Sequence, residues 1–332
     1  MTAERSGLDM LDAETLRTLL PPAVAVDAIE STLAGGLDPE RDAARVPTAV
    51  PAGEILLMPS HGARFAGVKV ATVAPGNPAR GLPKIQGIYV LLHAETLAPL
   101  AVMDGAELTL IRTPAVTVTA IKHLLLAGRG DLRVDRMLVF GTSLQALAHI
   151  RAATEVLDVG EVIVIGRRPD AAAQLAAVVA AGGSAASRAD GKVGLSARVG
   201  SPADLGDADV IVCATSSRTA VFDGSRVKSS AVVAAIGSHG LDAREIDPAL
   251  ARRADVVVEG RASALREGGD LIPARSAEEW EQHPPANLAE LVAGSVQRRQ
   301  DSPALFTGVG MSWEDLVIAG RAYERLGSQR TS

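Results

Sequence analysis

A glycine-bearing turn between a strand-like run and a helical stretch is the clearest chemical signal in the sequence. Gly141-Thr-Ser-Leu-Gln-Ala146 follows the apolar run 136–140 and opens a helix predicted over 144–157. Backbone N–H groups at such a helix start hold the pyrophosphate of a dinucleotide. The usual pattern is G-x-G-x-x-G/A, and Ser143 replaces its second glycine here. Ser143 still offers a backbone N–H and a hydroxyl, so we predict a dinucleotide site, with a purely structural turn as the alternative.

The end of the next strand-like run bears on which dinucleotide would bind. In NAD-binding domains an acidic residue there accepts a hydrogen bond from the ribose 2′-hydroxyl. This chain has Gly166 at that position, followed by Arg167 and Arg168. Two guanidinium groups suit a 2′-phosphate, so we expect NADPH, with NADH possible. The alternative is that both arginines are solvated loop charges.

Lys69 is a charged residue within the apolar strand-like run Gly67-Val-Lys-Val-Ala71. A buried charge without a partner is costly, so a lysine here needs either a partner or an exit to solvent. Burial would also lower its pKa and make it a better proton donor. Two interpretations stay open, a buried functional lysine and one that points to solvent from an alternating strand.

Two kinds of element pattern position these residues. Residues 13–33 predict two helices broken at Pro21-Pro22, and short strand-like runs follow at 52–58, 66–72, 85–93 and 97–103. A long helix is predicted over 108–126. From 136 onward, continuous apolar strands alternate with helices, which indicates a parallel sheet covered on both faces. The predicted class is α/β, with a Rossmann-type doubly wound domain and a smaller α+β unit.

Composition narrows the function classes further. With 332 residues, two domains are expected. Aromatic residues make up 2% of the chain and its net charge is −6, so we expect no nucleic-acid or anionic-membrane partner. The single cysteine, Cys213, excludes an intramolecular disulfide and is interpreted as a small buried hydrophobe. The histidines show no metal-ligand spacing, so no metal is expected.

The sequence also bears on location. The first ten residues carry two acids and no apolar core, so we expect no signal peptide. We also expect no apolar stretch of the roughly 20 residues that span a bilayer, since acids and a histidine interrupt 91–110. A cytoplasmic protein is the resulting expectation.

Several segments taken in order resemble the ornithine cyclodeaminase/μ-crystallin family across nearly the whole chain. They are Leu57-Met-Pro59, Gly67-Val-Lys69, Asp104-Gly-Ala-Glu-Leu-Thr-Leu-Ile-Arg-Thr113, Gly141–Ala146, Ala214-Thr-Ser-Ser217, Ala235-Ile-Gly-Ser-His239, Arg244-Glu-Ile-Asp247, Val309-Gly-Met311 and Glu314-Asp-Leu316. The resemblance implies a discontinuous substrate-binding and dimerisation domain, 1–117 with 304–332, around a Rossmann domain, 118–303. It also implies a homodimer.

The resemblance assigns roles to individual residues. Arg45, Lys69 and Arg112 match the positions that hold the substrate carboxylate, and Lys69 and His239 are the candidate catalytic residues. The implied cofactor-binding residues are Thr113, Gly141, Thr142, Ser143, Gln145, Ala146, Arg167, Arg168, Ala214, Thr215, Ser216, Gly237, Ser238, Val309 and Gly310. Asp315 matches a family acid near the active-site rim, without an assigned step.

Two departures from the cyclodeaminases direct the expected chemistry. An acid that they carry before Met-Pro is Leu56 here, although Glu54 lies two residues earlier, and their distal aspartate is His239. Losing both acids removes the groups that would recognise a second amino group. The branch with Gly-Ser-His at this point resembles the ketimine and Δ1-pyrroline-2-carboxylate reductases.

We therefore expect NAD(P)H-dependent reduction of a small cyclic ketimine carboxylate, Δ1-pyrroline-2-carboxylate or Δ1-piperideine-2-carboxylate, to the L-amino acid. The proton donor would be Lys69, His239 or water. Three alternatives remain: an alanine-dehydrogenase-like or N-alkyl-amino-acid dehydrogenase, an ornithine cyclodeaminase, and a non-enzymatic NADP-dependent binding protein.

Overall fold

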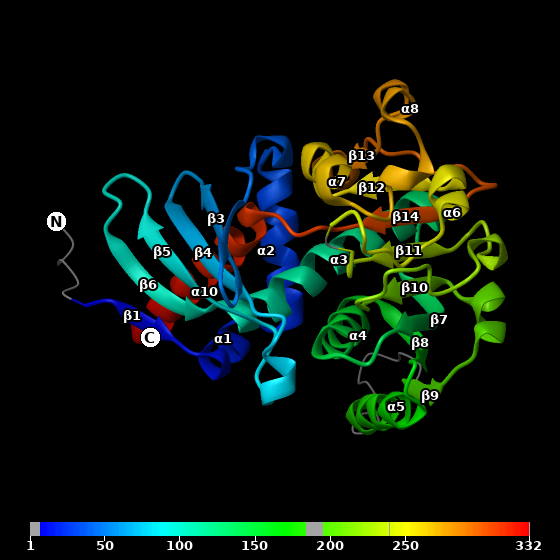
Figure 1. Cartoon of the computed structure of the whole chain (residues 1–332), viewed down its shortest axis with the longest axis horizontal. Coiled ribbons are helices and arrows are strands. Elements are labelled where there is room, and N and C mark those ends of the chain that lie inside the picture. Colours follow the sequence, from blue (N-terminus) through cyan, green and yellow to red (C-terminus); the bar gives the residue numbers. More distant parts are fainter. Residues whose placement is uncertain (1–6, 184–194, 239, 332) are drawn as a thin grey trace. The chain divides into compact units, whose positions relative to one another are not determined.

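The computed structural model describes residues 7–183, 195–238 and 240–331. It divides into two compact units (Figure 1): the first comprises 1–32, 41–112 and 311–332, and the second 33–40 and 113–310. The predicted boundaries, 117/118 and 303/304, differ from this division. His239 lies outside the described residues, so its predicted role stays a sequence-based expectation.

The first unit is built on a six-stranded sheet with the order β1-β6-β5-β4-β3-β2. Its strands are β1 (Asp9–Leu11), β2 (Val46–Val50), β3 (Gly53–His61), β4 (Phe65–Val73), β5 (Ile85–His93) and β6 (Pro99–Asp104). Its helices are α1 (Ala13–Leu19), α2 (Pro22–Ala34) and α10 (Ser312–Thr331), and its 3-10 turns are η1 (Pro39–Arg41) and η2 (Pro78–Arg80). The last residues of α2 and the first residues of η1 group with the second unit. The predicted break at Pro21-Pro22 is confirmed.

One face of this sheet is buried, and α10 packs against β3, β4 and β5. Side chains directly opposite one another on neighbouring strands share a face. One such row runs across four strands and is buried throughout: Met58, Lys69, Tyr89 and Met103. Lys69 therefore belongs to the buried face, and the solvent-facing interpretation of this residue is wrong.

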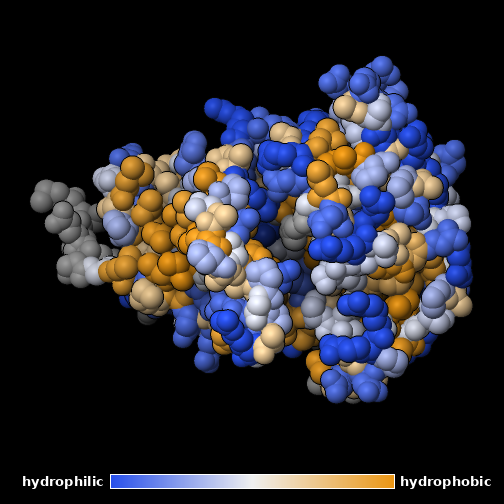
Figure 2. All heavy atoms as spheres, in the orientation of Figure 1, coloured by the Kyte–Doolittle hydropathy of each residue, from blue (hydrophilic) through white to orange (hydrophobic). Residues whose placement is uncertain are grey.

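The opposite face of the same sheet carries an apolar row. A row across β2 to β5 consists of Val46, Leu57, Val70 and Ile88, and three of its members are exposed. Met10 on β1 is the most exposed large apolar side chain of the described residues, at 72%. Figure 2 shows apolar side chains gathered over this part of the first unit. An exposed apolar area on a sheet face marks an interaction surface.

The second unit holds an eight-stranded, all-parallel sheet with the order β13-β12-β14-β11-β10-β7-β8-β9. Its strands are β7 (Arg133–Phe140), β8 (Asp158–Ile165), β9 (Ser196–Val199), β10 (Val210–Cys213), β11 (Val232–Ala235), β12 (Asp255–Val258), β13 (Ala286–Asn287) and β14 (Ala304–Thr307). Its helices are α4 (Leu144–Val156), α5 (Pro169–Gly183), α6 (Pro248–Arg253), α7 (Arg261–Glu267), α8 (Ala277–Gln282) and α9 (Leu288–Val292), with 3-10 turns η3 (Pro202–Asp207), η4 (Gly224–Arg226) and η5 (Ile272–Ala274).

The strand order of the second unit reverses beside β7. From β7 the chain proceeds through β8 to β9 on one side and then returns to β10 and β11 on the other. In open parallel sheets, ligands bind at such a switch point, outside the carboxyl ends of the strands. The predicted Rossmann-type architecture is confirmed.

The segment from residue 304 corrects the predicted domain layout. Ala304–Thr307 forms β14, which pairs with β11 and β12 inside the parallel sheet. The second unit ends only at Gly310. The sequence around Ala304 carries no boundary signal, because a short buried apolar strand looks alike in either unit.

The helix α3 (Gly105–Arg129) continues from one unit into the other and extends the predicted helix 108–126 at both ends. It is long and apolar enough to cross a membrane by length and composition alone, contrary to the expectation of no such stretch, and 61% of its most apolar window is buried inside the protein. Burial of this kind is typical of a core helix, so it is weak evidence for a membrane span.

A buried histidine predicts acid sensitivity of the second unit. His149 on α4 is fully buried, its Nδ1 lies 2.7 Å from the Gln145 carbonyl oxygen, and its Nε2 lies 3.1 Å from the Thr117 hydroxyl. Burial lowers the pKa of His149 to about 4, below its ordinary value of 6.5. Between these values the unfolded chain binds the proton more tightly, so this histidine's contribution to stability is lost as the pH falls.

We expect acidification from pH 7 to pH 5 to lower the free energy of unfolding through this residue by about 2 kcal/mol. Urea unfolding of the wild type and of His149→Gln at both pH values isolates the effect from other titrating groups. The variant should lose about 2 kcal/mol less than the wild type on acidification. Equal losses of unfolding free energy in the two proteins would show that groups other than His149 cause the acid sensitivity.

Candidate functional site

The first unit holds a buried cluster of two cations and two carboxylates. Lys69 lies 2.9 Å from Asp315 through Nζ and Oδ1, and it also contacts the Thr109 hydroxyl. Arg112 Nη1 lies 2.5 Å from Glu314 Oε2, and its Nε lies 3.7 Å from Asp315 Oδ1. Both cations are at most 6% exposed and both carboxylates are inaccessible. The structure therefore brings two of the three predicted carboxylate-binding residues together.

Three elements position this cluster. Lys69 projects from β4 onto the buried face, Arg112 lies within α3, and Glu314 and Asp315 occupy the first turn of α10. Acids in the first turn of a helix are favoured by the helix dipole. The carboxylates are 202 and 246 residues from their partners, so only the folded chain reveals the pairing.

The N-terminus of α10 is itself held by a half-buried acid. Asp42 accepts a hydrogen bond from the Ser312 backbone N–H at 2.7 Å and from the Ser60 hydroxyl at 3.3 Å. Burial raises the pKa of Asp42 to about 6, although these hydrogen bonds oppose the shift. This contact ties the segment before β2 to the helix that carries Asp315.

Arg45 stands three residues after Asp42 and directly before β2, and it is half-buried. Val46 pairs with Leu57, and the next residue of β3, Met58, pairs with Lys69. Continuing this register places Arg45 two strands from Lys69, about 10 Å away at normal strand spacing. Arg45 thus lies in the same part of the sheet as the cluster.

Of the two acid positions that distinguish cyclodeaminases, Leu56 falls on this sheet, and His239 lies outside the described residues. Leu56 pairs with Ala71, two residues from Lys69 on the same face. Glu54 pairs with Val73, four residues from Lys69 along β4, which is about 13 Å. Glu54 therefore lies too far along the sheet to take the place of an acid at position 56.

Burial sets the electrostatics of Lys69. Removal from water lowers the pKa of Lys69, the Asp315 carboxylate opposes that shift, and the nearby Arg112 guanidinium adds to it. The proton on Lys69 is therefore held chiefly by Asp315. Such a balance fits a lysine that binds an anion or delivers a proton.

In the second unit, the turn after β7 has the geometry that the sequence predicted for a phosphate cradle. Gly141 adopts a φ of +119°, and a Cβ there would lie 2.4 Å from the Ala214 carbonyl oxygen. Ser143 caps α4 by accepting a hydrogen bond from the Ala146 N–H at 3.3 Å. Its φ of −84° is ordinary, so serine fits this position without backbone strain.

Further predicted cofactor residues gather at the carboxyl edge of the same sheet. Thr215 follows β10, Gly237 follows β11, and Val309 and Gly310 follow β14. The buried Glu259 carboxylate accepts hydrogen bonds from the Val309 and Gly310 N–H groups at 2.9 and 2.7 Å. Ala214, Ser216 and Ser238 are on the same loops, and Thr142 is in the turn after β7. Gln145 is in the first turn of α4, Thr113 is on α3, and Arg167 and Arg168 are exposed after β8. An edge with a glycine turn, a capped helix and ordered loops fits a dinucleotide.

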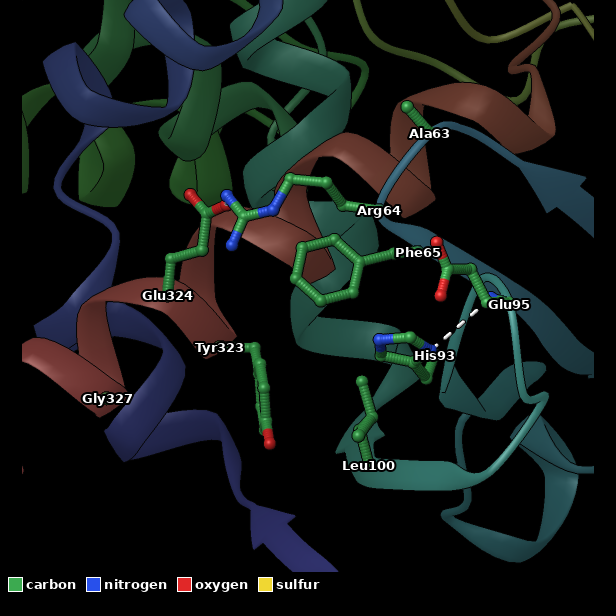
Figure 3. Close-up of a pocket in the computed structure, with 9 residues that line it drawn as sticks. All are labelled: Ala63, Arg64, Phe65, His93, Glu95, Leu100, Tyr323, Glu324 and Gly327. Carbon is green, nitrogen blue, oxygen red and sulfur yellow. Dashed lines mark hydrogen bonds and ion pairs between the residues drawn. The ribbon is translucent and has the colours of Figure 1, made fainter. Parts of the chain in front are cut away.

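A separate hollow of about 460 Å³ lies in the first unit, between β4, β5, β6 and α10 (Figure 3). Phe65 and Tyr323 meet edge to face there, Arg64 pairs with Glu324, and His93 accepts a hydrogen bond from the Glu95 N–H. None of the residues lining this hollow is a predicted site residue. Among the described residues, no group of three His, Cys, Asp or Glu side chains could hold a metal ion.

Comparison with known proteins places these features in a family. Residues 18–330 match the model of the ornithine cyclodeaminase/mu-crystallin family. The chain belongs to this family. A curated relative, the Δ1-pyrroline-2-carboxylate/Δ1-piperideine-2-carboxylate reductase of Azospirillum brasilense, is 34% identical over 279 residues, which is 84% of this chain and 82% of that protein.

Solved structures of other family members share the whole fold. The Δ1-pyrroline-2-carboxylate reductase of Thermococcus litoralis, solved with NADH and L-proline, is 26% identical, with a TM-score of 0.83 over 97% of this chain and 98% of that one. An archaeal alanine dehydrogenase dimer with bound NAD is 26% identical, with a TM-score of 0.80 over 97% of each chain. The expected family and architecture are thus confirmed.

Proposed function

We propose that this protein is an NAD(P)H-dependent reductase of a small cyclic ketimine carboxylate, Δ1-pyrroline-2-carboxylate or its six-membered homologue, and yields the L-amino acid. The observation that carries the proposal is the buried Lys69–Asp315 and Arg112–Glu314 cluster in a chain whose curated relatives are named as reductases of these imines. The reaction adds a hydride to C2 and a proton to the ring nitrogen. NAD(P)H supplies the hydride when bound at the carboxyl edge of the parallel sheet.

The charges of three residues near the first unit's sheet suggest how the substrate carboxylate is held. Arg112 and Lys69 hold the substrate carboxylate, with Arg45 as the third cation. A planar guanidinium grips a carboxylate through two parallel hydrogen bonds, and this fixes the orientation of the ring. Catalysis is then largely orientation, because the cofactor carries the reactive hydrogen. Lys69 also stands as a proton source, with His239 and water as the other candidates.

A substrate panel tests this function against its nearest rivals. Purified protein is incubated with NADPH or NADH and Δ1-pyrroline-2-carboxylate, Δ1-piperideine-2-carboxylate, or pyruvate with ammonia or methylamine. A separate incubation contains L-ornithine and NAD⁺. We expect fast cofactor oxidation with a cyclic ketimine only. Preference for pyruvate and an amine would indicate an amino-acid dehydrogenase, and ammonia release from ornithine would indicate a cyclodeaminase.

The phosphorylated cofactor is the finer part of the proposal. Arg167 and Arg168 follow β8 and are exposed, where a ribose 2′-substituent would lie in this type of fold. The double substitution of Arg167 and Arg168 by alanine should raise the KM for NADPH about tenfold or more and leave the KM for NADH within twofold. The reason is that each arginine makes charge-assisted contacts only with the 2′-phosphate. Equal rises of the KM for NADPH and the KM for NADH would mean that the arginines do not bind the 2′-phosphate.

A homodimer is proposed for the apolar sheet face of the first unit. The outward row Val46, Leu57, Val70 and Ile88 leaves three apolar side chains exposed on neighbouring strands, as at an interaction surface. Ile88, 46% exposed at the β5 end of this row, is the site for a test. The wild type should sediment as a dimer, and Ile88→Glu as a folded monomer, because a carboxylate cannot be buried unpaired. A monomeric wild type, or a variant that remains dimeric, would contradict this interface.

A further inference from the structure

One buried carboxylate joins the loops that leave two neighbouring strands of the parallel sheet. Glu245 Oε1 accepts hydrogen bonds from the Thr215 backbone N–H at 2.6 Å and from the Thr215 hydroxyl at 2.7 Å. Its Oε2 accepts from the N–H groups of Ile236 at 3.1 Å and Gly237 at 2.6 Å. Thr215 follows β10 and Gly237 follows β11, so a single side chain fixes both strand ends.

The two loops are in contact at this point. A Cβ added to Gly237 would lie 1.9 Å from the Thr215 carbonyl oxygen, so only glycine allows this approach. Gly141, in the turn after β7, approaches the Ala214 carbonyl oxygen in the same way. The loops after β7, β10 and β11 therefore form one contiguous edge, and the carboxylate of Glu245 lies behind it.

Glu245 is held in place by a second buried acid. Asp270 Oδ1 accepts hydrogen bonds from the backbone N–H groups of Glu245 at 2.7 Å and Ile246 at 3.0 Å. Both acids are inaccessible to solvent. Burial raises the pKa of Glu245 to about 7 and also raises the pKa of Asp270. Such a site is costly to build, since a buried carboxylate must be compensated by several donors.

We propose that Glu245 is a positioning residue for the cofactor: it sets the loops after β10 and β11 in the arrangement that receives the nicotinamide half of the dinucleotide. This inference rests on the proposed function. Thr215 and Gly237 are both predicted cofactor residues, and the edge lies beside the point where the strand order reverses. Two donors from the loop after β10 and two from the loop after β11 bind the two oxygens of Glu245. The carboxylate therefore links the two loops to each other.

The test compares Glu245→Gln with wild type by direct titration of NADH and NADPH, followed by nicotinamide fluorescence. Glutamine keeps the size of the side chain but turns an NH₂ group toward one pair of donors, so one loop loses its acceptor. The Kd for the cofactor should rise tenfold or more, because hydrogen bonds to charged groups are the stronger kind. The KM for the ketimine at saturating cofactor should stay within twofold, since its proposed ligands lie in the first unit.

Asp247→Asn is the matched control. Asp247 is two residues away, and its carboxylate accepts from the N–H groups of Leu250 and Gly224 rather than from a cofactor loop. This control should leave the cofactor Kd within twofold of wild type. Where Glu245→Gln does not fold by circular dichroism, Thr215→Val decides, because it removes the hydroxyl that donates to Oε1 and accepts from the Ser217 N–H at 3.2 Å, and leaves the carboxylate in place. We expect a severalfold rise in the cofactor Kd.

The outcomes separate this inference from the proposed function. If the wild type binds the cofactor and the folded Glu245→Gln binds it equally well, the positioning role is overturned and the reductase proposal stands. An unchanged Kd in Thr215→Val overturns the positioning role in the same way when the glutamine variant is unfolded. If the wild type binds neither NADH nor NADPH, the proposed function is overturned, and this inference with it.

Discussion

Replacing Arg112 with methionine is expected to lower kcat/KM for the cyclic ketimine at least a hundredfold, while the Kd for NAD(P)H stays within twofold of wild type. In the proposed site the guanidinium supplies two charge-assisted hydrogen bonds to the substrate carboxylate, each worth about 1.5–3 kcal/mol. The cofactor loops belong to the other unit of the chain. The loss therefore falls on ketimine reduction and not on cofactor binding. Steady-state kinetics and cofactor titration measure the two effects separately.

A second variant separates the chemistry of Arg112 from its effect on folding. Arg112→Met leaves Glu314 buried without its cation, which costs about 3–5 kcal/mol of stability in comparable sites. The double substitution Arg112→Met with Glu314→Gln removes both charges and should recover most of that stability without recovering activity. Arg330→Met, at a half-exposed pair with Asp9, serves as the control with near-normal kinetics. A single variant that folds and keeps its kcat/KM would contradict the carboxylate role.

Replacing Asp315 with asparagine is expected to move the alkaline limb of the kcat/KM profile to lower pH. Burial lowers the pKa of Lys69, and the Asp315 carboxylate, 2.9 Å away, is the main opposing influence. Removing that charge lowers the pKa of Lys69 further, so the lysine loses its proton at a lower pH. In the proposed mechanism the cationic form of Lys69 holds the substrate carboxylate and is one of the candidate proton sources. We expect kcat/KM at pH 8 to fall at least tenfold.

The control for this prediction lies on the same helix. Glu324→Gln removes an acid of α10 that pairs with Arg64 at the surface and should leave the pH profile unchanged. The comparison uses kcat/KM for the ketimine, measured from pH 6 to pH 10 at saturating cofactor, in the wild type and both variants. An alkaline limb that stays in place in Asp315→Asn would show that Asp315 does not govern the protonation of Lys69.

Much of the fold could be predicted from local patterns. Continuous runs of Val and Ile indicated β7, β8, β10, β11 and β12, because a parallel strand buried on both faces is apolar throughout. The breaks at Pro21-Pro22 and after β7 at Gly141 were visible because proline and glycine restrict or free the backbone in known ways. The strands β1, β2, β9 and β13 were not predicted, because none of them is a continuous run of large apolar residues.

The site was predictable in its residue types and not in its partners. Lys69 and Arg112 were named from their motifs, and burial of Lys69 was one of two interpretations that its strand allowed. Asp315 was noted without a role, because a separation of 246 residues hides its contact with Lys69. Glu245 had no predicted role, although it lies in a matched motif, because its four donors come from the ends of two strands.

Hydride transfer to the ring carbon of a ketimine is the central claim, and isotope transfer tests it most directly. NADH and NADPH deuterated at C4, in each of the two stereochemical forms, are incubated with the protein and Δ1-pyrroline-2-carboxylate. The product is then examined by proton NMR. We expect L-proline with one deuterium at Cα from one of the two forms. Absence of proline, or proline that carries no label from either form while cofactor is oxidised, would contradict hydride transfer to the ketimine.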